Sequence, residues 1–150
     1  MNKIIETIKE IHNKDICMFK VGTFYHIYNK DAEILSYILK YKIKELGENH
    51  KECGFPLGAL PKVTAKLEDL KINYLTLDRR NNYDVDAKED YKNLNNYEKY
   101  YQKAHRYVNN YKRIEKLSDF LKENIEKECF SELIKRAENV IYEGRKIQSN

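Results

Sequence analysis

Basic side chains are concentrated in one tract of the chain, and their spacing suits contact with nucleic acid. Between Tyr91 and Lys116 there are seven basic and two acidic residues, a local excess of +5, whereas the whole 150-residue chain carries +4. Such a tract on a nearly neutral body favours an anionic partner, and a merely solvated helix face explains the charge equally well. Spacings of three and four place Lys99, Lys103 and Arg106 on one helix face, and Lys112 and Arg113 continue the series of candidate nucleic-acid contacts.

Other residues capable of chemistry do not form a catalytic or metal-binding set. His50 and Cys53 could present two ligands on one loop, which is too few for a structural zinc site. The sequence contains no GxxxxGK[ST] phosphate loop, so no ATP-driven step is expected from this chain. Most carboxylates alternate with lysine, as on solvated helix faces. We therefore expect a protein that is not an enzyme and that needs no cofactor and no metal.

Composition limits the class of protein further. Apolar residues make up 41% of the chain and charged residues 35%, as in a soluble globular protein. No apolar run approaches the roughly 18 residues of a membrane span, and the charged N-terminal segment predicts a helix and not a signal peptide. Three widely spaced cysteines favour free thiols over a disulfide framework, which indicates a cytoplasmic location.

The first part of the chain alternates helical and strand-like patterns. We expect a helix over 2–13, and a hairpin of strands around the two-residue connection Gly22-Thr23. A helix capped by Asn29 is expected to run to Gly47, followed by a short strand, a loop ending at Pro61 and another helix. A buried strand covers INYLTLD, and the polar stretch DRRNNYDVD is expected to be a loop. This order predicts an α/β fold over residues 1–88, a small mixed sheet covered by helices.

Residues 89–150 are expected to form a basic, tyrosine-rich helical hairpin. A continuous 3-4 apolar spacing indicates a coiled-coil-like seam, and a second helix follows a short connection near Cys129. The tyrosines of this tract could stack on exposed bases, but for Tyr97, Tyr101 and Tyr111 we favour packing within the seam. The predicted seam residues are Leu94, Tyr97, Tyr101, Ala104, Val108 and Tyr111.

The segment MFKVGTFYHIYNKDAEIL resembles the start of the mismatch-recognition domain, domain I, of the DNA repair protein MutS. In that family an apolar strand, a glycine and Phe-Tyr-Glu precede a helix that opens with Asp-Ala. Gly22, Phe24, Tyr25 and the pair Asp31-Ala32 stand in matching places here. The similarity continues through GFPLGALPKVTAKLEDLKINYLTLD and extends from about Ile16 to Arg80.

The resemblance implies a role for two positions. In the family the phenylalanine wedges beside a mispaired base and the glutamate hydrogen-bonds that base. The matching phenylalanine is Phe24, whereas His26 occupies the position of the glutamate, which weakens the case for mismatch discrimination. His26 could instead donate to a base or a phosphate. Lys20 in the same segment is a further candidate contact, and packing of Phe24 inside the hairpin core is the alternative to a functional role.

Free-standing MutS-like proteins of this size resemble accessory proteins of bacterial diversity-generating retroelements. The resemblance thus implies a nucleic-acid-binding accessory protein whose partners are a DNA duplex or RNA–DNA hybrid and a reverse transcriptase. The alternative is a protein–protein adaptor or oligomerising scaffold without nucleic-acid contact, and the formation of a homo-oligomer is left open. No membrane partner is expected.

Overall fold

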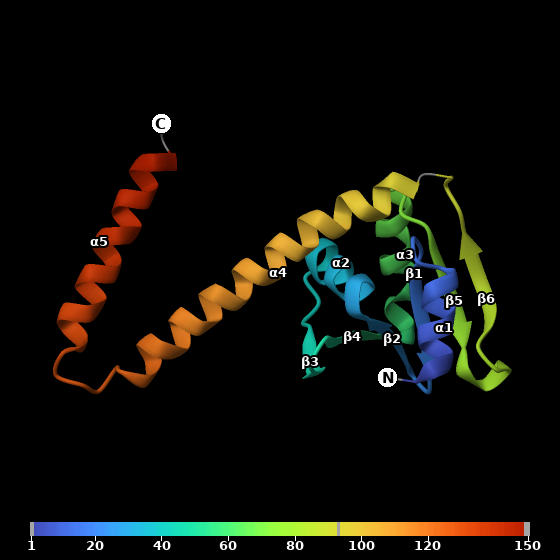
Figure 1. The fold of residues 1–150 in the computed structure, drawn as a ribbon, viewed down its shortest axis with the longest axis horizontal. Coiled ribbons are helices and arrows are strands. Elements are labelled where there is room, and N and C mark those ends of the chain that lie inside the picture. The colour runs from blue at the N-terminus through green and yellow to red at the C-terminus, as the bar shows by residue number, and fades with distance from the viewer. Residues whose placement is uncertain (1, 93, 149–150) are drawn as a thin grey trace. The chain divides into compact units, whose positions relative to one another are not determined.

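The computed structural model describes residues 2–92 and 94–148, and the side chain of Leu94 lies outside the described part. The chain divides into two compact units, Met1–Val108 and Asn109–Asn150. The division falls within one long helix, α4. The first unit is an α/β fold, and the chain ends in a pair of helices (Figure 1).

A six-stranded mixed sheet forms the centre of the first unit, with strand order β3-β4-β2-β1-β5-β6. Only β1 and β5 are parallel; the other neighbours pair antiparallel. The strands are β1 (Ile16–Val21), β2 (Phe24–Tyr28), β3 (Lys44–Gly47), β4 (His50–Pro56), β5 (Tyr74–Asp78) and β6 (Asp84–Glu89). The helices are α1 (Lys3–Ile11), α2 (Asn29–Leu39), α3 (Leu60–Asp69), α4 (Leu94–Glu123) and α5 (Phe130–Gln148), with short 3-10 turns η1 (Leu57–Ala59) and η2 (Arg79–Asn81).

The predicted hairpin around Gly22-Thr23 is confirmed. Val21 pairs with Phe24, and Gly22 takes a φ of 62°, a left-handed conformation that a residue without Cβ adopts at little cost. Because side chains alternate along a strand, the pairing sends Tyr25 and Ile27 to one face of the sheet and Phe24, His26 and Tyr28 to the other.

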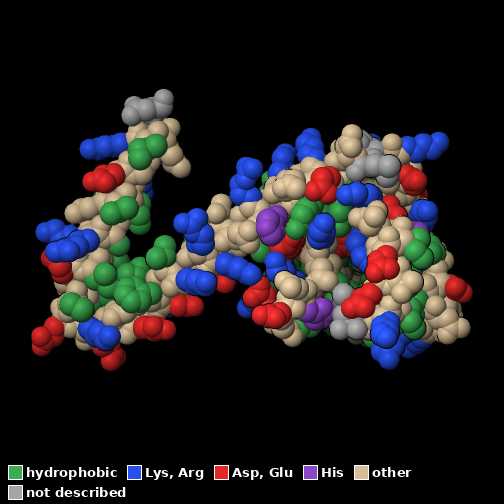
Figure 2. Space-filling view, viewed as in Figure 1, with side chains coloured by type: hydrophobic (Ala, Val, Ile, Leu, Met, Phe, Trp, Pro, Cys, Tyr) green, Lys and Arg blue, Asp and Glu red, His purple; other side chains and the backbone are tan. Residues whose placement is uncertain are grey.

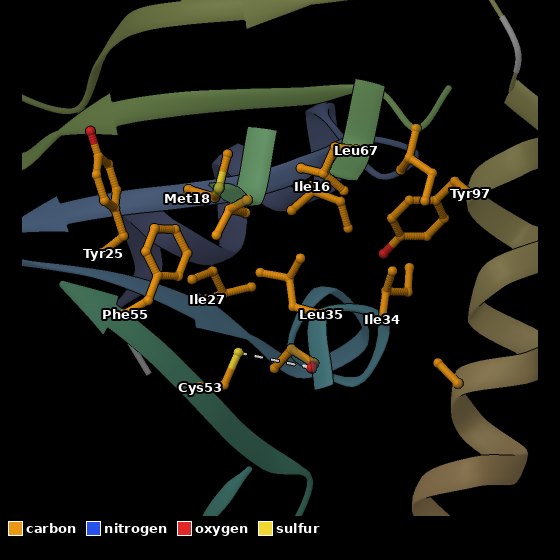
Figure 3. Packing of buried hydrophobic residues seen from close by; sticks show 14 residues of the cluster. Ile16, Met18, Tyr25, Ile27, Ile34, Leu35, Cys53, Phe55, Leu67 and Tyr97 are labelled. Carbon is orange, nitrogen blue, oxygen red and sulfur yellow. Dashed lines mark hydrogen bonds between the residues drawn. The ribbon is translucent and has the colours of Figure 1, made fainter. Parts of the chain in front are cut away.

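Two apolar clusters fill the two faces of the sheet. The larger lies under α2, α3 and the beginning of α4 and includes Met18, Ile27, Leu35, Phe55 and Leu67 (Figure 3). The smaller lies under α1, where Ile5 meets the side chains of Cys17, Phe19, Leu75 and Leu77. The two-sided covering explains why β1 is an almost continuous apolar run and not an alternating one.

Three predicted elements differ from the structure. The helix that begins at Asn29 ends at Leu39 and not at Gly47, because Lys40 takes a left-handed φ of 61° and residues 44–47 form the edge strand β3. Asn29 does not cap that helix; its side-chain oxygen accepts from the backbone N–H of Lys51 on β4. The stretch predicted as a loop, residues 78–86, includes the first half of β6, which pairs antiparallel with β5.

The beginning of α4 packs on the α/β core and not in a seam with a second helix. Tyr97 and Ala104 are almost fully buried in the larger cluster, and the partly buried Tyr101 packs against it. The prediction of a hairpin seam was therefore wrong for these residues, whereas Tyr111, in the second unit, is 51% exposed. Leu94, also predicted for the seam, has its side chain outside the described part.

Candidate nucleic-acid interface

Phe24 opens strand β2 on the face of the sheet that α1 covers only in part. α1 packs over β1 and β5 through Ile5 and Ile8, and Phe24 keeps 47% of its surface exposed. Its neighbour Tyr25 points to the other face and is buried. The sequence left open that Phe24 packs in the core of the hairpin, and the structure contradicts that alternative. An exposed aromatic side chain on a rigid strand can stack on or wedge between bases.

A carboxylate lies beside His26, supplied by the neighbouring strand. Nδ1 of His26 and Oε1 of Glu52 are in hydrogen-bond contact, and both side chains are partly exposed. Glu52 sits on β4 opposite Tyr28, on the same face of the sheet as Phe24 and His26. Gly54 stands directly opposite His26, where a Cβ would come within 3.0 Å of the Tyr25 carbonyl oxygen. The missing side chain leaves the sheet surface flat beside the imidazole.

Glu52 was not among the residues predicted from the sequence. Its contact with His26 joins positions 26 residues apart and depends on the antiparallel register of β2 and β4. No local sequence pattern predicts the pairing register of β2 and β4. The structure thus places a carboxylate in this site although position 26 itself holds histidine.

A cavity of about 530 Å³ lies between α1 and the same face of the sheet. Its apolar wall includes Ile5, Phe19 and Tyr28, and the ring of Tyr28 stacks on His50 with centroids 5.7 Å apart. Lys9 in its lining is already engaged, because its Nζ lies 2.8 Å from Oδ1 of the buried Asp31. The cavity therefore combines this apolar wall with the charged side chains of Glu6, Glu10 and Lys30.

Basic and tyrosine side chains form a second surface on the other side of the sheet, where α4 packs on α2. Lys and Arg side chains follow α4 along its length (Figure 2). Nζ of Lys30 lies 4.8 Å from the ring centre of Tyr101, and Nζ of Lys40 lies 4.2 Å from that of Tyr107. We call this the basic–tyrosine surface; its members are Lys30, Lys40, Lys99, Lys103, Arg106, Tyr100, Tyr101 and Tyr107.

Side-chain contacts position the basic–tyrosine surface on α2. Tyr37 and Tyr107 meet edge to face with centroids 5.6 Å apart, and Nδ1 of His105 lies 3.4 Å from the buried carboxylate of Glu33. Lys99 and Lys103 flank Tyr100 at 5.6 and 5.4 Å. The α2 lysines were not predicted from the sequence, because nothing local to residues 30–40 indicates that α4 packs beside them.

The predicted site residues fall into separate groups. Phe24 and His26 share one face of the sheet, whereas Lys99, Lys103 and Arg106 lie on the side covered by α2 and α4. Lys20 pairs with Tyr25 in the register, so its side chain is on the face opposite Phe24, with Nζ 3.8 Å from Oδ2 of Asp78. Lys112 and Arg113 belong to the second unit.

The buried thiols are unsuited to nucleophilic chemistry. Burial raises the pKa of Cys53 to about 12 and raises that of Cys17 still further. Sγ of Cys53 contacts the carbonyl oxygen of Ala32, while His50 faces the other side of the sheet, so the two do not converge on a metal. Among residues 2–92 and 94–148, no group of three or more His, Cys, Asp or Glu residues could hold a metal ion.

The described helices include none that is both long enough and apolar enough to cross a membrane.

Residues 1–74 match the family model of MutS domain I. The matched segment runs from the N-terminus to the first residue of β5, just under half of the 150-residue chain, and contains Phe24, His26 and Glu52. The resemblance noted from the sequence is thus supported for this segment. No curated protein matches the chain.

Proposed function

We propose that this protein is a non-enzymatic nucleic-acid-binding protein that grips a distorted duplex through Phe24. The observation that carries the proposal is the exposed phenylalanine at the start of β2, within the segment similar to MutS domain I. An aromatic side chain inserted between base steps partly unstacks them and kinks the duplex. Rigid backbone on both sides of Phe24, from the hairpin and the pairing to β4, holds the ring in place for that insertion.

His26 and Glu52 act in this proposal as a polar pair beside the wedge. Because Glu52 occupies Nδ1, the nitrogen left to meet a base edge or a phosphate is Nε2. The carboxylate repels phosphate, so the pair favours approach of a base over approach of the backbone. Because the Glu52 carboxylate only accepts, Nδ1 of His26 donates to it, and Nε2 of an uncharged ring is then the acceptor for a base edge.

The basic–tyrosine surface supplies a separate electrostatic contact. Its five cations would neutralise phosphates and release counterions, which makes affinity depend steeply on salt. Because it lies across the sheet from Phe24, it binds a different segment of the ligand or a single strand extending from the duplex. Tyrosine rings there provide stacking surfaces for unpaired bases.

The favoured ligands are a distorted DNA duplex or an RNA–DNA hybrid. A reverse transcriptase of a diversity-generating retroelement is the proposed protein partner. Support for that partner comes only from the similarity of residues 1–74 to MutS domain I. Co-purification of the chain with a reverse transcriptase from its host would test it.

The experiment that tests nucleic-acid binding compares four labelled ligands by fluorescence anisotropy across a salt series: homoduplex, mismatched duplex, RNA–DNA hybrid and single strand. We expect Phe24→Ala to weaken binding of one distorted ligand by tenfold or more. The matched control is Leu46→Ala, which removes another exposed apolar side chain, on the edge strand β3. Equal affinities of Phe24→Ala and the wild type for all four ligands would reject the wedge.

A protein–protein adaptor is the second candidate function, favoured by one observation. Large apolar side chains on the second half of α4 and on α5 are more than half exposed, among them Leu117 and Val140. Exposed apolar side chains gathered in one region mark interaction surfaces. The two candidate functions involve different units of the chain.

A further inference from the structure

The second unit of the chain, Asn109–Asn150, is built without an apolar core of its own. Among its described residues, 109–148, the one buried side chain is the polar Asn124, and α5 buries none. Both apolar clusters of the described chain draw their buried members from residues up to Ala104. The helices of this unit therefore lack the burial that stabilises helices in globular proteins.

The apolar side chains of this unit form a stripe along each helix. On α4, Ile114, Leu117 and Phe120 follow one another at intervals of three residues and are 61%, 66% and 52% exposed. On α5, Val140, Ile141 and Ile147 are 61–76% exposed and continue the face that begins with the half-buried Leu133 and Ala137. Hydrophobic side chains gather where α4 ends and α5 begins (Figure 2).

An amphipathic helix pair with these stripes uncovered is unstable in water. Most helical stability in proteins comes from packing of the apolar face and not from the helix alone. A segment of some 40 residues normally needs oligomerisation, disulfides or a metal to hold a fold. The described residues of this unit contain one cysteine and no candidate metal cluster. Packing of the stripes against another apolar surface would supply the missing burial.

The charged side chains of residues 109–148 indicate which kind of partner fits the stripes. Residues 109–148 carry nine basic and eight acidic side chains, interleaved along both helices. Such a balance gives little net attraction to a nucleic acid or to an anionic membrane, whereas residues 91–108 carry four basic side chains and one acidic side chain. A second copy of the same helices carries the same balanced pattern, so that acidic and basic residues flanking the stripes can pair in a symmetric complex.

We propose that two copies of the chain pair through the stripes of α4 and α5 and form a four-helix bundle. The two stripes of each copy meet those of the other across a twofold axis, the commonest symmetry of homo-oligomers. Eight large apolar side chains of residues 114–148, each more than half exposed, provide area on the order of the 800 Å² per partner that a standard interface buries. They are Ile114, Leu117, Phe120, Ile125, Val140, Ile141, Tyr142 and Ile147.

The pairing does not depend on the proposed nucleic-acid function, because the stripes and Phe24 belong to different units. It would nevertheless give the protein two copies of each nucleic-acid surface. The dependence on salt distinguishes nucleic-acid binding from pairing of two chains. Affinity for phosphates falls as the salt concentration rises, whereas association through buried apolar surface does not weaken.

Sedimentation equilibrium of the full chain, without nucleic acid and at 0.15 and 0.5 M salt, tests the proposal. We expect a mass of about twice the chain mass of 18.0 kDa at micromolar concentration and at both salt concentrations. Leu117→Glu and Val140→Glu should each raise the dissociation constant at least tenfold. The control Leu46→Glu adds the same charge at an exposed leucine of the first unit and should leave the mass unchanged.

A loss of fold is distinguished from a loss of pairing by a further variant. Leu117→Met keeps an apolar side chain at the stripe, and it should restore the doubled mass that Leu117→Glu removes. A mass of 18.0 kDa for the wild type at every concentration would overturn the proposal, as would a dimer that persists in both Glu variants. Binding of that monomer to neutral phospholipid vesicles would assign the stripes to a membrane surface instead and would equally overturn it.

Discussion

The hydroxyl of Tyr97 on α4 donates a 2.6 Å hydrogen bond to Oδ1 of Asp31 in the first turn of α2. The same carboxylate accepts from the backbone N–H of Cys17 on β1 and lies 2.8 Å from Nζ of Lys9 on α1. One buried acidic side chain therefore joins α1, β1, α2 and α4. Figure 3 shows Tyr97 reaching from α4 toward α2 beside Ile34 and Ile16.

Removal of the Tyr97 hydroxyl should destabilise the first unit moderately. In Tyr97→Phe, Asp31 keeps Lys9 and Cys17 as partners, so we expect a loss of about 1–2 kcal/mol of unfolding free energy. Tyr97→Ala also removes a buried ring and should cost about 3–5 kcal/mol. Urea denaturation measures both, with Leu46→Ala, at an exposed position of the same unit, as the control. Unchanged stability in Tyr97→Phe would contradict the joining role of Asp31.

Stability should fall as the pH rises above about 9. Burial raises the pKa of Cys17, Cys53 and Tyr97 above their ordinary values, which are 9.0 for the thiols. At alkaline pH the unfolded chain releases these protons while the folded chain holds them, so unfolding is favoured. Each thiol contributes a slope of up to about 1.4 kcal/mol per pH unit.

Urea midpoints from pH 7 to 10 measure this effect. The variant carrying both Cys17→Ala and Cys53→Ala should lose stability less steeply between pH 9 and 10 than the wild type, even where its stability at pH 7 is lower. Cys129→Ala, at an exposed position, is the control and should keep the wild-type slope. Parallel curves for all three proteins would contradict the burial of the two thiols.

Thiol reagents should distinguish the three cysteines of the native chain. Cys129 is exposed, whereas Cys17 and Cys53 are buried with raised pKa values. We expect one thiol per chain to react rapidly with a maleimide and the other two only on unfolding. Mass spectrometry of the labelled peptides identifies the sites, and rapid labelling of Cys53 in the folded protein would be incompatible with the structure.

The basic–tyrosine surface should account for much of the salt dependence of nucleic-acid binding. Each lost phosphate contact lowers the slope of log affinity against log salt by about 0.9 for duplex DNA. The triple change Lys99→Gln, Lys103→Gln, Arg106→Gln should therefore reduce the slope by roughly 2 to 3. Replacing Lys122, Lys127 and Lys135 by Gln removes the same charge from the second unit and should change the slope much less. Equal slopes for both triple variants would exclude the basic–tyrosine surface as the phosphate contact.

Local sequence patterns predicted the hairpin well and the sheet edges poorly. A Gly22-Thr23 connection between two runs of β-branched and aromatic residues is compatible with few local structures other than a β-hairpin. The edge strands β3 and β6 consist of exposed positions, so no apolar alternation marks them. Their strand character comes from hydrogen bonds to β4 and β5.

Residues whose role depends on long-range pairing could not be identified from the sequence. The seam spacing through Tyr97 and Ala104 indicates a buried helix face, but it does not say what covers that face. In the structure the cover is the α/β core, and Lys30 and Lys40 join the tyrosines of α4 for the same reason. Glu52 beside His26 follows from strand register, which spacing along a single segment does not encode.

Insertion of Phe24 beside a base can be measured through the fluorescence of 2-aminopurine. The probe is placed next to a mismatch in duplex DNA and in an RNA–DNA hybrid, where stacking quenches it. We expect wild-type protein to raise the fluorescence of at least one of these ligands, and Phe24→Ala, at saturating concentration, to leave it quenched. Leu46→Ala should behave as the wild type. An equal rise with Phe24→Ala, or a bound complex of wild-type protein in which the probe stays quenched in both ligands, would contradict the account.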